Sequence, residues 1–337
     1  MTLEKQTQAM LPALEAELRR QIDRIRASGM RPFHDMLEYH MGWTGSSSAT
    51  QAGGKRIRPL LLLLVCKSVG GRWRNALPAA AAIEITHNFS LVHDDIQDNS
   101  PTRRGRPALW KIHGAGLAIN AGDALLTIAN QAALDLEQHH PAATVLKASA
   151  ILHGACLDLT RGQFLDLYHQ RSNSLSLASY WEMIEGKTAA LIAAAAEMGA
   201  LLGQAKPLIR RDYREFGRLL GMAFQVQDDI LGTWGDETVT GKPAAGDLAE
   251  GKLSLPVVYG LRKKGRFAHK WGATRRRKSE AAVLRSLLEE EGAYAQSVRQ
   301  AQRLTSAALQ TLERLRPAGS AGAALIELTR QLLGRER

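Results

Sequence analysis

The stretch IEITHNFSLVHDDIQD, residues 83–98, decides how the rest of the sequence is interpreted. An apolar run ends here in a group of carboxylates that includes Asp94, Asp95 and Asp98. Residues four apart lie one helical turn from each other and about 40° apart around the axis. The stretch therefore predicts a helix that carries Asp94 and Asp98 on one side, near its C-terminal end.

A second stretch, FGRLLGMAFQVQDDILG at residues 216–232, repeats this pattern with Asp228 and Asp229. In both stretches the carboxylates lie at the helix end where the macrodipole disfavours negative charge. Neither cluster has a Lys or Arg three or four residues away. Buried carboxylates without a partner cost on the order of several kcal/mol, so two such clusters favour bound cations over a solvated acidic patch. Carboxylate oxygens select Mg²⁺ rather than zinc or copper.

Helical periodicity dominates the rest of the chain. One stripe of an N-terminal helix contains Leu11, Leu14, Leu18, Ile22 and Ile25. Five further segments are apolar over much of their circumference and are expected inside a bundle: 76–98, 117–137, 143–170, 187–203 and 213–231. Another helix is expected at 293–316. No series of alternating strands with hairpin turns, no internal repeat and no shift in composition is found. The sequence predicts one all-α domain over residues 1–337, a bundle of roughly 11–14 helices.

Composition supports a globular chain. Of 337 residues, 45% are hydrophobic and 23% charged, which excludes global disorder. The two cysteines, Cys66 and Cys156, form no CxxC pair and exclude a disulfide scaffold or a cysteine zinc site. The longest apolar runs have eight residues, whereas a transmembrane helix needs about 20. With no signal peptide recognised, we expect a cytoplasmic protein without a transmembrane segment.

The net charge of +11 is concentrated in one segment. Residues 262–278 hold nine Lys or Arg and no acid, and subtracting these nine charges leaves +2 for the remaining 320 residues. We expect this segment to be a solvated basic loop rather than a contact for an anion, a membrane surface or nucleic acid. No nucleic acid is expected as a partner.

Five short segments rich in Gly, Pro and basic residues complete the pattern. They are GKRIRP at 54–59, RRGRP at 103–107, GKT at 186–188, TGKP at 240–243 and EGK at 250–252. Glycine lets a ligand approach the backbone closely, and Lys and Arg are natural partners of phosphate oxygens. Each segment alone is more often an ordinary turn. Together with the two acidic clusters they predict a site for more than one diphosphate.

With these motifs the chain resembles the trans-isoprenyl diphosphate synthases of the polyprenyl synthetase family, most of all the short-chain geranylgeranyl and farnesyl diphosphate synthases. The resemblance runs from about Gly53 to Leu261 with the motifs in family order. They are GGKRIRP, HNFSLVHDDIQDNSPTRRGRP, NAGDALL, RGQFLDL, EGKTAAL, FQVQDDILG and TGKPAAGDLAEGK. The resemblance implies an all-helical fold around a deep central cavity and a homodimer. It also implies Mg²⁺, with three ions per active site, and condensation of isopentenyl diphosphate with dimethylallyl, geranyl or farnesyl diphosphate.

The resemblance assigns roles by matching positions. Asp94, Asp98 and Asp228 match metal ligands, with Asp95 and Asp229 as supporting neighbours. The isopentenyl diphosphate site matches Lys55, Arg58, His87 and Arg104. The allylic diphosphate site matches Arg103, Lys187, Thr188, Gln225, Lys242 and Lys252. The residues expected to act in catalysis are Asp94, Asp98, Arg103, Lys187, Asp228 and Lys242. One departure is Gly232, which stands where the second motif usually has a third aspartate.

Product length is predicted from the helix that carries Asp94. Phe89 lies five residues before Asp94 and Ser90 four before it, a depth of about 6–7.5 Å along the axis. The ring of Phe89 is expected to form a floor, Ser90 to leave room beside it, and Thr86 to let the tunnel continue. The expected product is C20 geranylgeranyl diphosphate; farnesyl diphosphate or a longer product is the alternative.

Three other functions are less well supported by the sequence. A class I terpene cyclase should carry Asn, Ser or Thr, and Glu in its second metal motif, but residues 225–233 read QVQDDILGT. A non-catalytic subunit of a heteromeric prenyl synthase should lack some of the aspartates or cations, yet all are present. A nucleic-acid or membrane-surface protein would rest on residues 262–278 alone.

Overall fold

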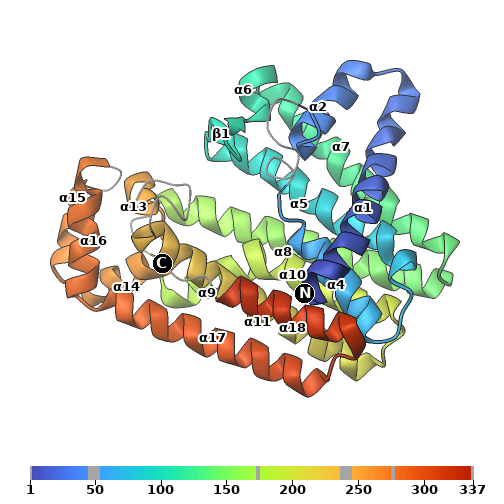
Figure 1. The fold of residues 1–337 in the computed structure, drawn as a ribbon. Coiled ribbons are helices and arrows are strands. Elements are labelled where there is room, and N and C mark those ends of the chain that lie inside the picture. The colour runs from blue at the N-terminus through green and yellow to red at the C-terminus, as the bar shows by residue number, and fades with distance from the viewer. Residues whose placement is uncertain (1, 45–53, 172–174, 236–244, 275–277, 335–337) are drawn as a thin grey trace. The chain divides into compact units, whose positions relative to one another are not determined.

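The computed structural model describes residues 2–44, 54–171, 175–235, 245–274 and 278–334. These residues are almost entirely helical (Figure 1). The two strands among them, β1 (Thr102–Arg103) and β2 (Arg106–Pro107), form one antiparallel hairpin. The all-α prediction is confirmed.

The fold separates into two compact units. Unit 1 comprises residues 1–153, 194–211 and 317–325, and unit 2 comprises 154–193, 212–316 and 326–337. Whether both act as one domain over the whole chain stays a prediction.

Unit 1 is built on α1 (Thr2–Ile22), η1 (Asp23–Ser28), α2 (Arg31–Met41), α4 (Ile57–Ser68), η2 (Trp73–Ala76), α5 (Leu77–Gln97), the β1–β2 hairpin, α6 (Leu109–His113), α7 (Ala115–Leu134) and η3 (Asp135–Gln138). Unit 2 is built on α9 (Leu177–Ile184), the π-helical turn η4 (Glu185–Ala189), α13 (Gly246–Glu250), α14 (Leu255–Lys263), α15 (Arg266–Thr274), η5 (Lys278–Glu280), α16 (Ala281–Glu290) and α17 (Ala293–Leu315). Four helices contribute residues to both units: α8 (Ala142–Arg171), α10 (Ala190–Leu202), α11 (Pro207–Trp234) and α18 (Gly319–Leu333).

The core of unit 1 is formed by α4 and α5. Every residue of α4 from Leu60 to Cys66 is buried. In α5 the run Ala79–Ala82 is buried, and its small side chains allow neighbouring helices to approach closely. α5 packs along α7 and also contacts α4 and α1. The helix that carries Asp94 is thus held on several sides before it reaches its functional end.

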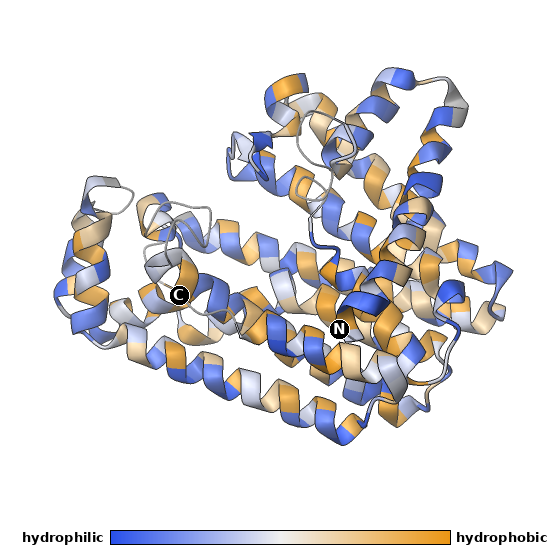
Figure 2. Cartoon of the chain, viewed as in Figure 1, coloured by the Kyte–Doolittle hydropathy of each residue, from blue (hydrophilic) through white to orange (hydrophobic). Residues whose placement is uncertain are grey.

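The core of unit 2 gathers apolar side chains from α9, α11, α14, α15 and α16. Its fully buried members include Tyr180, Phe267, Trp271, Leu284 and Leu288. α17 packs against α14 and α16 through one face. In Figure 2 hydrophobic and hydrophilic residues alternate along α17, as expected for a helix with one buried side.

The described part of the basic segment 262–278, which leaves out residues 275–277, is largely helical, and this corrects the prediction of a loop. Its first residues close α14, and α15 follows. Phe267 and Trp271 lie four residues apart, stack with centroids 5.5 Å apart and are buried, so they fix a helical turn that a charge count cannot reveal. Arg266 pairs with Glu290 at 3.0 Å and Lys270 with Glu280 at 2.9 Å.

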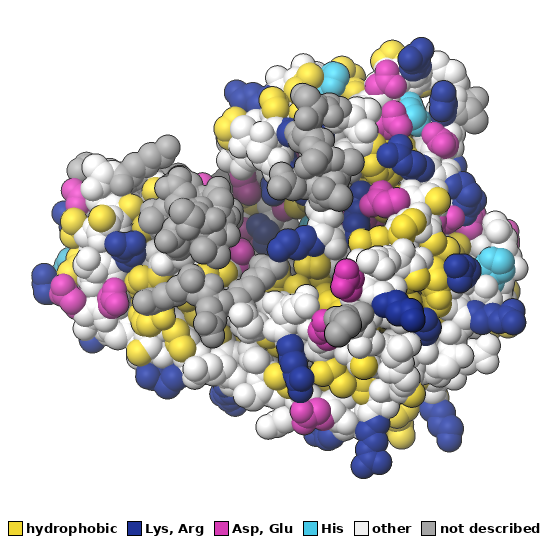
Figure 3. Space-filling model, viewed as in Figure 1, with side chains coloured by type: hydrophobic (Ala, Val, Ile, Leu, Met, Phe, Trp, Pro, Cys, Tyr) yellow, Lys and Arg dark blue, Asp and Glu magenta, His cyan; other side chains and the backbone are white. Residues whose placement is uncertain are grey.

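The described cations of this segment are therefore partly neutralised by acids of the same unit. On the face shown in Figure 3, Lys and Arg side chains are scattered rather than gathered in one patch.

The helices expected at 117–137 and 143–170 are present as α7 and α8, but each keeps an exposed apolar face. Leu134 is 55% exposed, Leu146 70% and Phe164 62%. The prediction that both are interior helices is therefore wrong. An apolar sequence around a helix shows that its faces can be buried, but it does not show that another part of the same chain packs on them. Among the described helices α8 alone is long and apolar enough to cross a membrane by composition, a weak indication by itself.

The helical state of the basic segment can be tested at Trp271. Trp271→Ala removes a side chain that is 1% exposed and should lower the free energy of unfolding by about 3–5 kcal/mol, measured by urea denaturation. His269→Ala removes an exposed side chain from the same helix and should change it by less than about 0.5 kcal/mol. Equal effects of the two substitutions would contradict a packed α15.

Candidate active site

The three aspartates at the C-terminal end of α5 differ in how deeply they are buried. Asp95 is 1% exposed, whereas Asp94 is half-buried and Asp98 is exposed. Asp95 accepts hydrogen bonds from Arg103, from Nε at 2.9 Å and also from Nη2. Burial raises the pKa of Asp95 and Arg103 opposes this effect. Asp95 thus anchors Arg103, and the oxygens of Asp94 and Asp98 lie on less buried sides of the helix end.

The β1–β2 hairpin presents two arginines through a tight turn. Arg103 pairs with Arg106, and between them Arg104 and Gly105 have φ values of 52° and 73°. A two-residue turn in which both residues have left-handed backbone conformations matches the right-handed twist of the strands of a hairpin. A Cβ on Gly54 would lie 2.8 Å from Nη2 of Arg104, so the arginine side chain lies directly on the backbone that precedes Lys55.

A buried ion-pair network fixes the segment that contains Lys55. Arg56 is 4% exposed and donates to Glu84 at 2.8 Å and to Glu15 at 2.7 Å. It also donates to the carbonyl oxygen of Met41 at 3.3 Å. Glu84 lies on α5, ten residues before Asp94, so the same helix holds this segment and the first acidic cluster.

Three of the four residues assigned to isopentenyl diphosphate lie in one cationic cluster. Burial lowers the pKa of His87 well below its ordinary value, and the charges of Arg58 and Arg104 lower it further. Burial also lowers the pKa of Arg58 and of Arg104. Nε of Arg58 is buried and has no hydrogen-bond partner among the described residues. A buried guanidinium donor without an acceptor calls for an anion.

Lys187 lies on the π-helical turn η4, beside α8. A Cβ on Gly162 of α8 would lie 2.1 Å from the backbone nitrogen of Lys187, and one on Gly186 would lie 2.5 Å from the carbonyl oxygen of Asp158. These two glycines let the backbones of α8 and η4 touch, and π-helical turns are frequent at functional sites. Lys187 forms an ion pair with Asp166 of α8.

A chain of hydrogen bonds links the other residues of unit 2. Thr188 donates to Gln225 at 2.6 Å, and Gln225 donates to Asp229 at 2.9 Å. Asp229 also accepts from the hydroxyl of Tyr180 at 2.6 Å and from the backbone nitrogen of Leu255 at 2.7 Å. Burial raises the pKa of Asp229 to about 7 against the effect of these donors. With both oxygens engaged, Asp229 holds α9, α11 and α14 together.

Asp228 is exposed next to this buried aspartate. Lys252 is partly exposed and pairs with Asp247 at 3.2 Å and with Glu250 at 2.8 Å. Lys242, assigned to the allylic diphosphate, lies outside the described residues.

The residues predicted to set product length lie on α5. Phe89 is 7% exposed, and its ring meets His93 edge to face at 5.8 Å. Ser90 donates to the carbonyl oxygen of His87 at 2.8 Å. Thr86 is buried, and its hydroxyl has no partner among the described residues.

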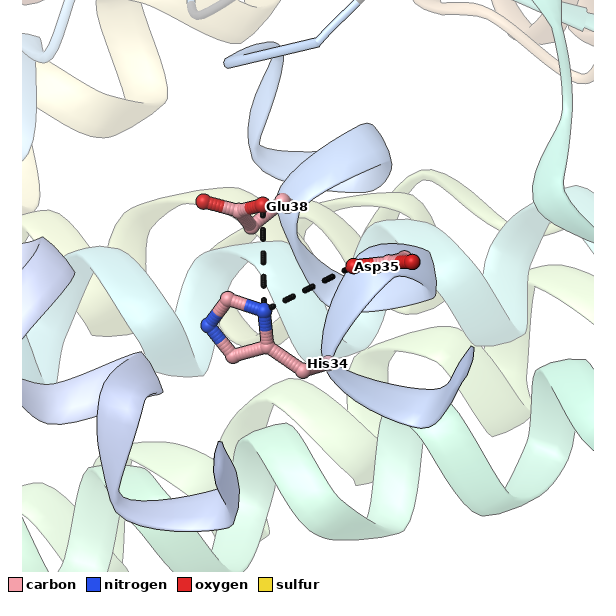
Figure 4. A group of neighbouring side chains, drawn as sticks. All are labelled: His34, Asp35 and Glu38. Carbon is pink, nitrogen blue, oxygen red and sulfur yellow. Dashed lines mark ion pairs between the residues drawn. The ribbon is translucent and has the colours of Figure 1, made fainter. Parts of the chain in front are cut away.

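A separate group on α2, drawn in Figure 4, combines His34 with Asp35 and Glu38. Nδ1 of His34 lies 3.9 Å and 3.7 Å from the two carboxylates, and Nε2 lies 2.9 Å from Asp23. Glu38 also pairs with Arg19 at 3.7 Å. These partners explain the group as a histidine that is hydrogen-bonded between α2 and η1.

Three residues that organise the site carry no predicted role: Glu84, Asp166 and Tyr180. The signal for Glu84 was an acid inside an apolar run, and for Asp166 its place in the RGQFLDL motif. Tyr180 carries no local signal, because its partner Asp229 is 49 residues away.

The arrangement of helices is that of the isoprenoid synthases. The geranylgeranyl pyrophosphate synthetase of Pyrococcus horikoshii superposes with a TM-score of 0.89 at 28% identity, covering 99% of this chain and 98% of that one. Residues 45–291 match the polyprenyl synthetase family, and the chain belongs to it.

Two proteins from Mycobacterium tuberculosis are similar to this chain in sequence. A geranylgeranyl diphosphate synthase is 38% identical over 262 residues, 77% of this chain and 74% of the relative. A (2E,6E)-farnesyl diphosphate synthase is 40% identical over 244 residues, 72% of this chain. The chain spans only 66% of the length of that farnesyl diphosphate synthase.

The contact between α8 and η4 can be tested at Gly162. Gly162→Ala places a methyl group against the backbone of Lys187 and should destabilise the protein by about 1–3 kcal/mol in urea. Gly154→Ala on the same helix meets no atom within 4 Å and should be neutral or stabilise by up to about 1 kcal/mol. If Gly162→Ala behaved like Gly154→Ala, the close approach would be refuted.

Proposed function

We propose that the protein is a trans-prenyltransferase that condenses isopentenyl diphosphate with dimethylallyl, geranyl or farnesyl diphosphate. One observation carries the proposal. The end of α5 presents Asp94 and Asp98, while the buried Asp95 between them holds Arg103. Carboxylates that suit a divalent cation and an arginine that suits anionic oxygens therefore lie side by side at the end of this helix.

The residues present fit Mg²⁺. Asp94, Asp98 and Asp228 carry their carboxylates on half-buried or exposed side chains, where a hydrated cation can reach them. Hard oxygen donors of this kind suit Mg²⁺, and we propose these three aspartates as its ligands, with three ions per site as in the family resemblance. When bound, the ions neutralise the diphosphate leaving group as its charge develops.

Arg58, His87, Arg104 and Lys55 are proposed to bind isopentenyl diphosphate. The buried Nε of Arg58 lacks an acceptor, which a phosphate oxygen would supply. Because the pKa of His87 is held low, its imidazole is neutral and acts as a hydrogen-bond donor rather than a charge.

Arg103, Lys187, Thr188, Gln225, Lys242 and Lys252 are proposed to bind the allylic diphosphate. Lys187 is held by Asp166, and Thr188 by Gln225, so both are oriented before a ligand arrives. Preoriented cations stabilise charge that develops in the transition state more than charge in the ground state.

The chain supplies no dedicated general base in this scheme. After the allylic diphosphate ionises, the alkene of isopentenyl diphosphate attacks the allylic cation and a proton is lost. The released diphosphate, held by Arg103 and Lys187, is the proposed acceptor of that proton.

The proposed product is C20 geranylgeranyl diphosphate, with farnesyl diphosphate or a longer chain as the alternative. Support comes from Phe89, a buried ring one to two turns before Asp94, and from relatives named for C15 and C20 products.

We further propose that the protein works as a homodimer in the cytoplasm. The exposed apolar faces of α7 and α8 support this, because solvated monomers rarely expose so many large apolar side chains on neighbouring elements. Coverage by a second copy would explain why both helices are apolar around most of their circumference.

The proposed reaction is tested by incubating the purified protein with isopentenyl diphosphate, Mg²⁺ and each of the three allylic diphosphates. The products are then identified by mass spectrometry. Asp94→Ala should lower turnover more than ~10³-fold at saturating substrate. The substitution removes a proposed ligand of the Mg²⁺ ions, whose charge stabilises the transition state. Glu137→Ala, an exposed acid of η3, should leave turnover unchanged. No product from any primer would refute the reaction, and normal turnover of Asp94→Ala would refute the ligand assignment.

Product length is tested at Phe89. Phe89→Ala removes the proposed floor and should shift products to C25 and longer without abolishing condensation, as measured by mass spectrometry. Leu134→Ala truncates an exposed side chain of α7 and should leave the product distribution unchanged. An unchanged distribution in a folded, active Phe89→Ala protein would place the floor elsewhere.

A further inference from the structure

The hairpin that carries Arg104 is too short to hold its own shape. Strands β1 and β2 have two residues each, and an isolated two-stranded hairpin is marginally stable at best in water. Arg104 lies in the turn between the strands, with a left-handed φ of 52°. Strand β1 is held from α5, where Asp95 accepts from Arg103. The direction of the Arg104 side chain therefore depends also on what holds the second strand.

Strand β2 is held from α2 by Tyr39. The hydroxyl of Tyr39 donates to the carbonyl oxygen of Pro107 at 2.9 Å. The guanidinium of Arg106 lies over the ring of Tyr39, 3.9 Å from its centroid, which is the geometry of a cation–π contact. Nη2 of Arg106 is buried and has no hydrogen-bond partner among the described residues, so the face of this ring is the contact that compensates it. Each strand thus has one anchor on a helix.

The last turn of α2 also contacts the two other elements that carry proposed ligands of isopentenyl diphosphate. His40 donates from Nε2 to the carbonyl oxygen of Asn88, the residue after His87 on α5, at 3.1 Å. The carbonyl oxygen of Met41 accepts from Arg56, in the segment that precedes α4, at 3.3 Å. Three successive residues of α2 therefore contact the hairpin, α5 and the segment before α4.

The charge at this end of α2 suits its neighbours. Carbonyl groups at the C-terminus of a helix carry partial negative charge, which stabilises nearby cations. Burial lowers the pKa of His40 to about 3, and the positive charges of Arg104 and Arg103 contribute to this shift. Both arginines therefore lie close to the end of α2, where the helix offsets part of their mutual repulsion.

We infer that the last turn of α2 positions Arg104 for the diphosphate group of isopentenyl diphosphate, with Tyr39 as the positioning residue. This inference rests on the proposed function, because it concerns the site proposed for that substrate. Tyr39 acts through the hairpin: it fixes β2, and β2 fixes the turn that carries Arg104. Arg103 has its own anchor in Asp95, so the allylic diphosphate depends on Tyr39 much less.

A purely structural role is the competing explanation, in which Tyr39 only packs α2 against the hairpin. In that case a substitution at Tyr39 lowers the free energy of unfolding, but the folded enzyme keeps its KM values. If Tyr39 positions Arg104, the KM for isopentenyl diphosphate rises in the folded enzyme, while the KM for the allylic diphosphate and kcat change little.

The test is steady-state kinetics of the full chain, with isopentenyl diphosphate and geranyl diphosphate varied in turn. Tyr39→Leu removes the hydrogen bond and the cation–π contact and should raise the KM for isopentenyl diphosphate about 5–50-fold. Tyr39→Phe keeps the ring and should raise it about 2–10-fold. In both variants the KM for geranyl diphosphate and kcat should change less than about 3-fold. Phe33→Leu, a control near the other end of α2, should change each constant less than about 2-fold.

A double variant tests whether Tyr39 and Arg106 act through one contact. The KM for isopentenyl diphosphate of Tyr39→Leu with Arg106→Leu should equal that of Tyr39→Leu alone, because the second substitution removes a contact that is already lost. Circular dichroism establishes that each variant is folded; should Tyr39→Leu not fold, Tyr39→Phe and Arg106→Leu carry the same test.

Three results would overturn the inference. They are an unchanged KM for isopentenyl diphosphate in the folded variants, an equal rise for both substrates, and a double variant in which the two effects multiply. Absence of product with the unmodified protein would instead refute the proposed function.

Discussion

The ion pair between Arg56 and Glu84 is the interaction on which the arrangement of unit 1 depends. Both side chains are more than nine-tenths buried, and removing one partner of such a pair costs about 3–5 kcal/mol because the other charge is left unpaired. The pair ties the segment before α4 to α5. Glu84 also offsets the repulsion between Arg58 and Arg104, since its charge raises the pKa of both.

In both acidic clusters, one aspartate is buried and holds neighbouring elements, while the aspartate next to it is less buried. In each, adjacent aspartates point about 100° apart around a helix, so one is buried while its neighbour is not. Asp95 holds Arg103, and Asp229 holds Tyr180 and the start of α14. The buried members fix elements that are distant in sequence. Asp94 and Asp228 are less buried than these neighbours, and they are the aspartates proposed to bind the cation.

Helix positions could be predicted from sequence because hydrophobic periodicity is local. The expected helix at 76–98 is observed at Leu77–Gln97, and the one at 293–316 at Ala293–Leu315. The basic segment was misjudged because its charges outnumber the two aromatic residues, Phe267 and Trp271, that fix it as a helix.

What the sequence could not predict depends on contacts between distant residues. Asp247 meets Gly232 only after the chain has left α11 and returned as α13, and Gly162 meets Lys187 only when α8 lies against η4. Neither contact changes the hydrophobic periodicity of the two segments that form it, so the sequence of each segment does not reveal it. The exposed faces of α7 and α8 were missed for a related reason, because an apolar helix surface has the same sequence whether its cover is this chain or another.

The low pKa of His87 has a consequence for how an anion would be received. Part of the shift comes from the positive charges of Arg58 and Arg104. An anion bound between these arginines cancels that part of the field, so the imidazole gains affinity for a proton when the anion arrives. Coupling of this kind is reciprocal, so protonation strengthens anion binding by the same factor. An anion bound at this cluster would therefore raise the pKa of the half-buried His87 toward its ordinary value.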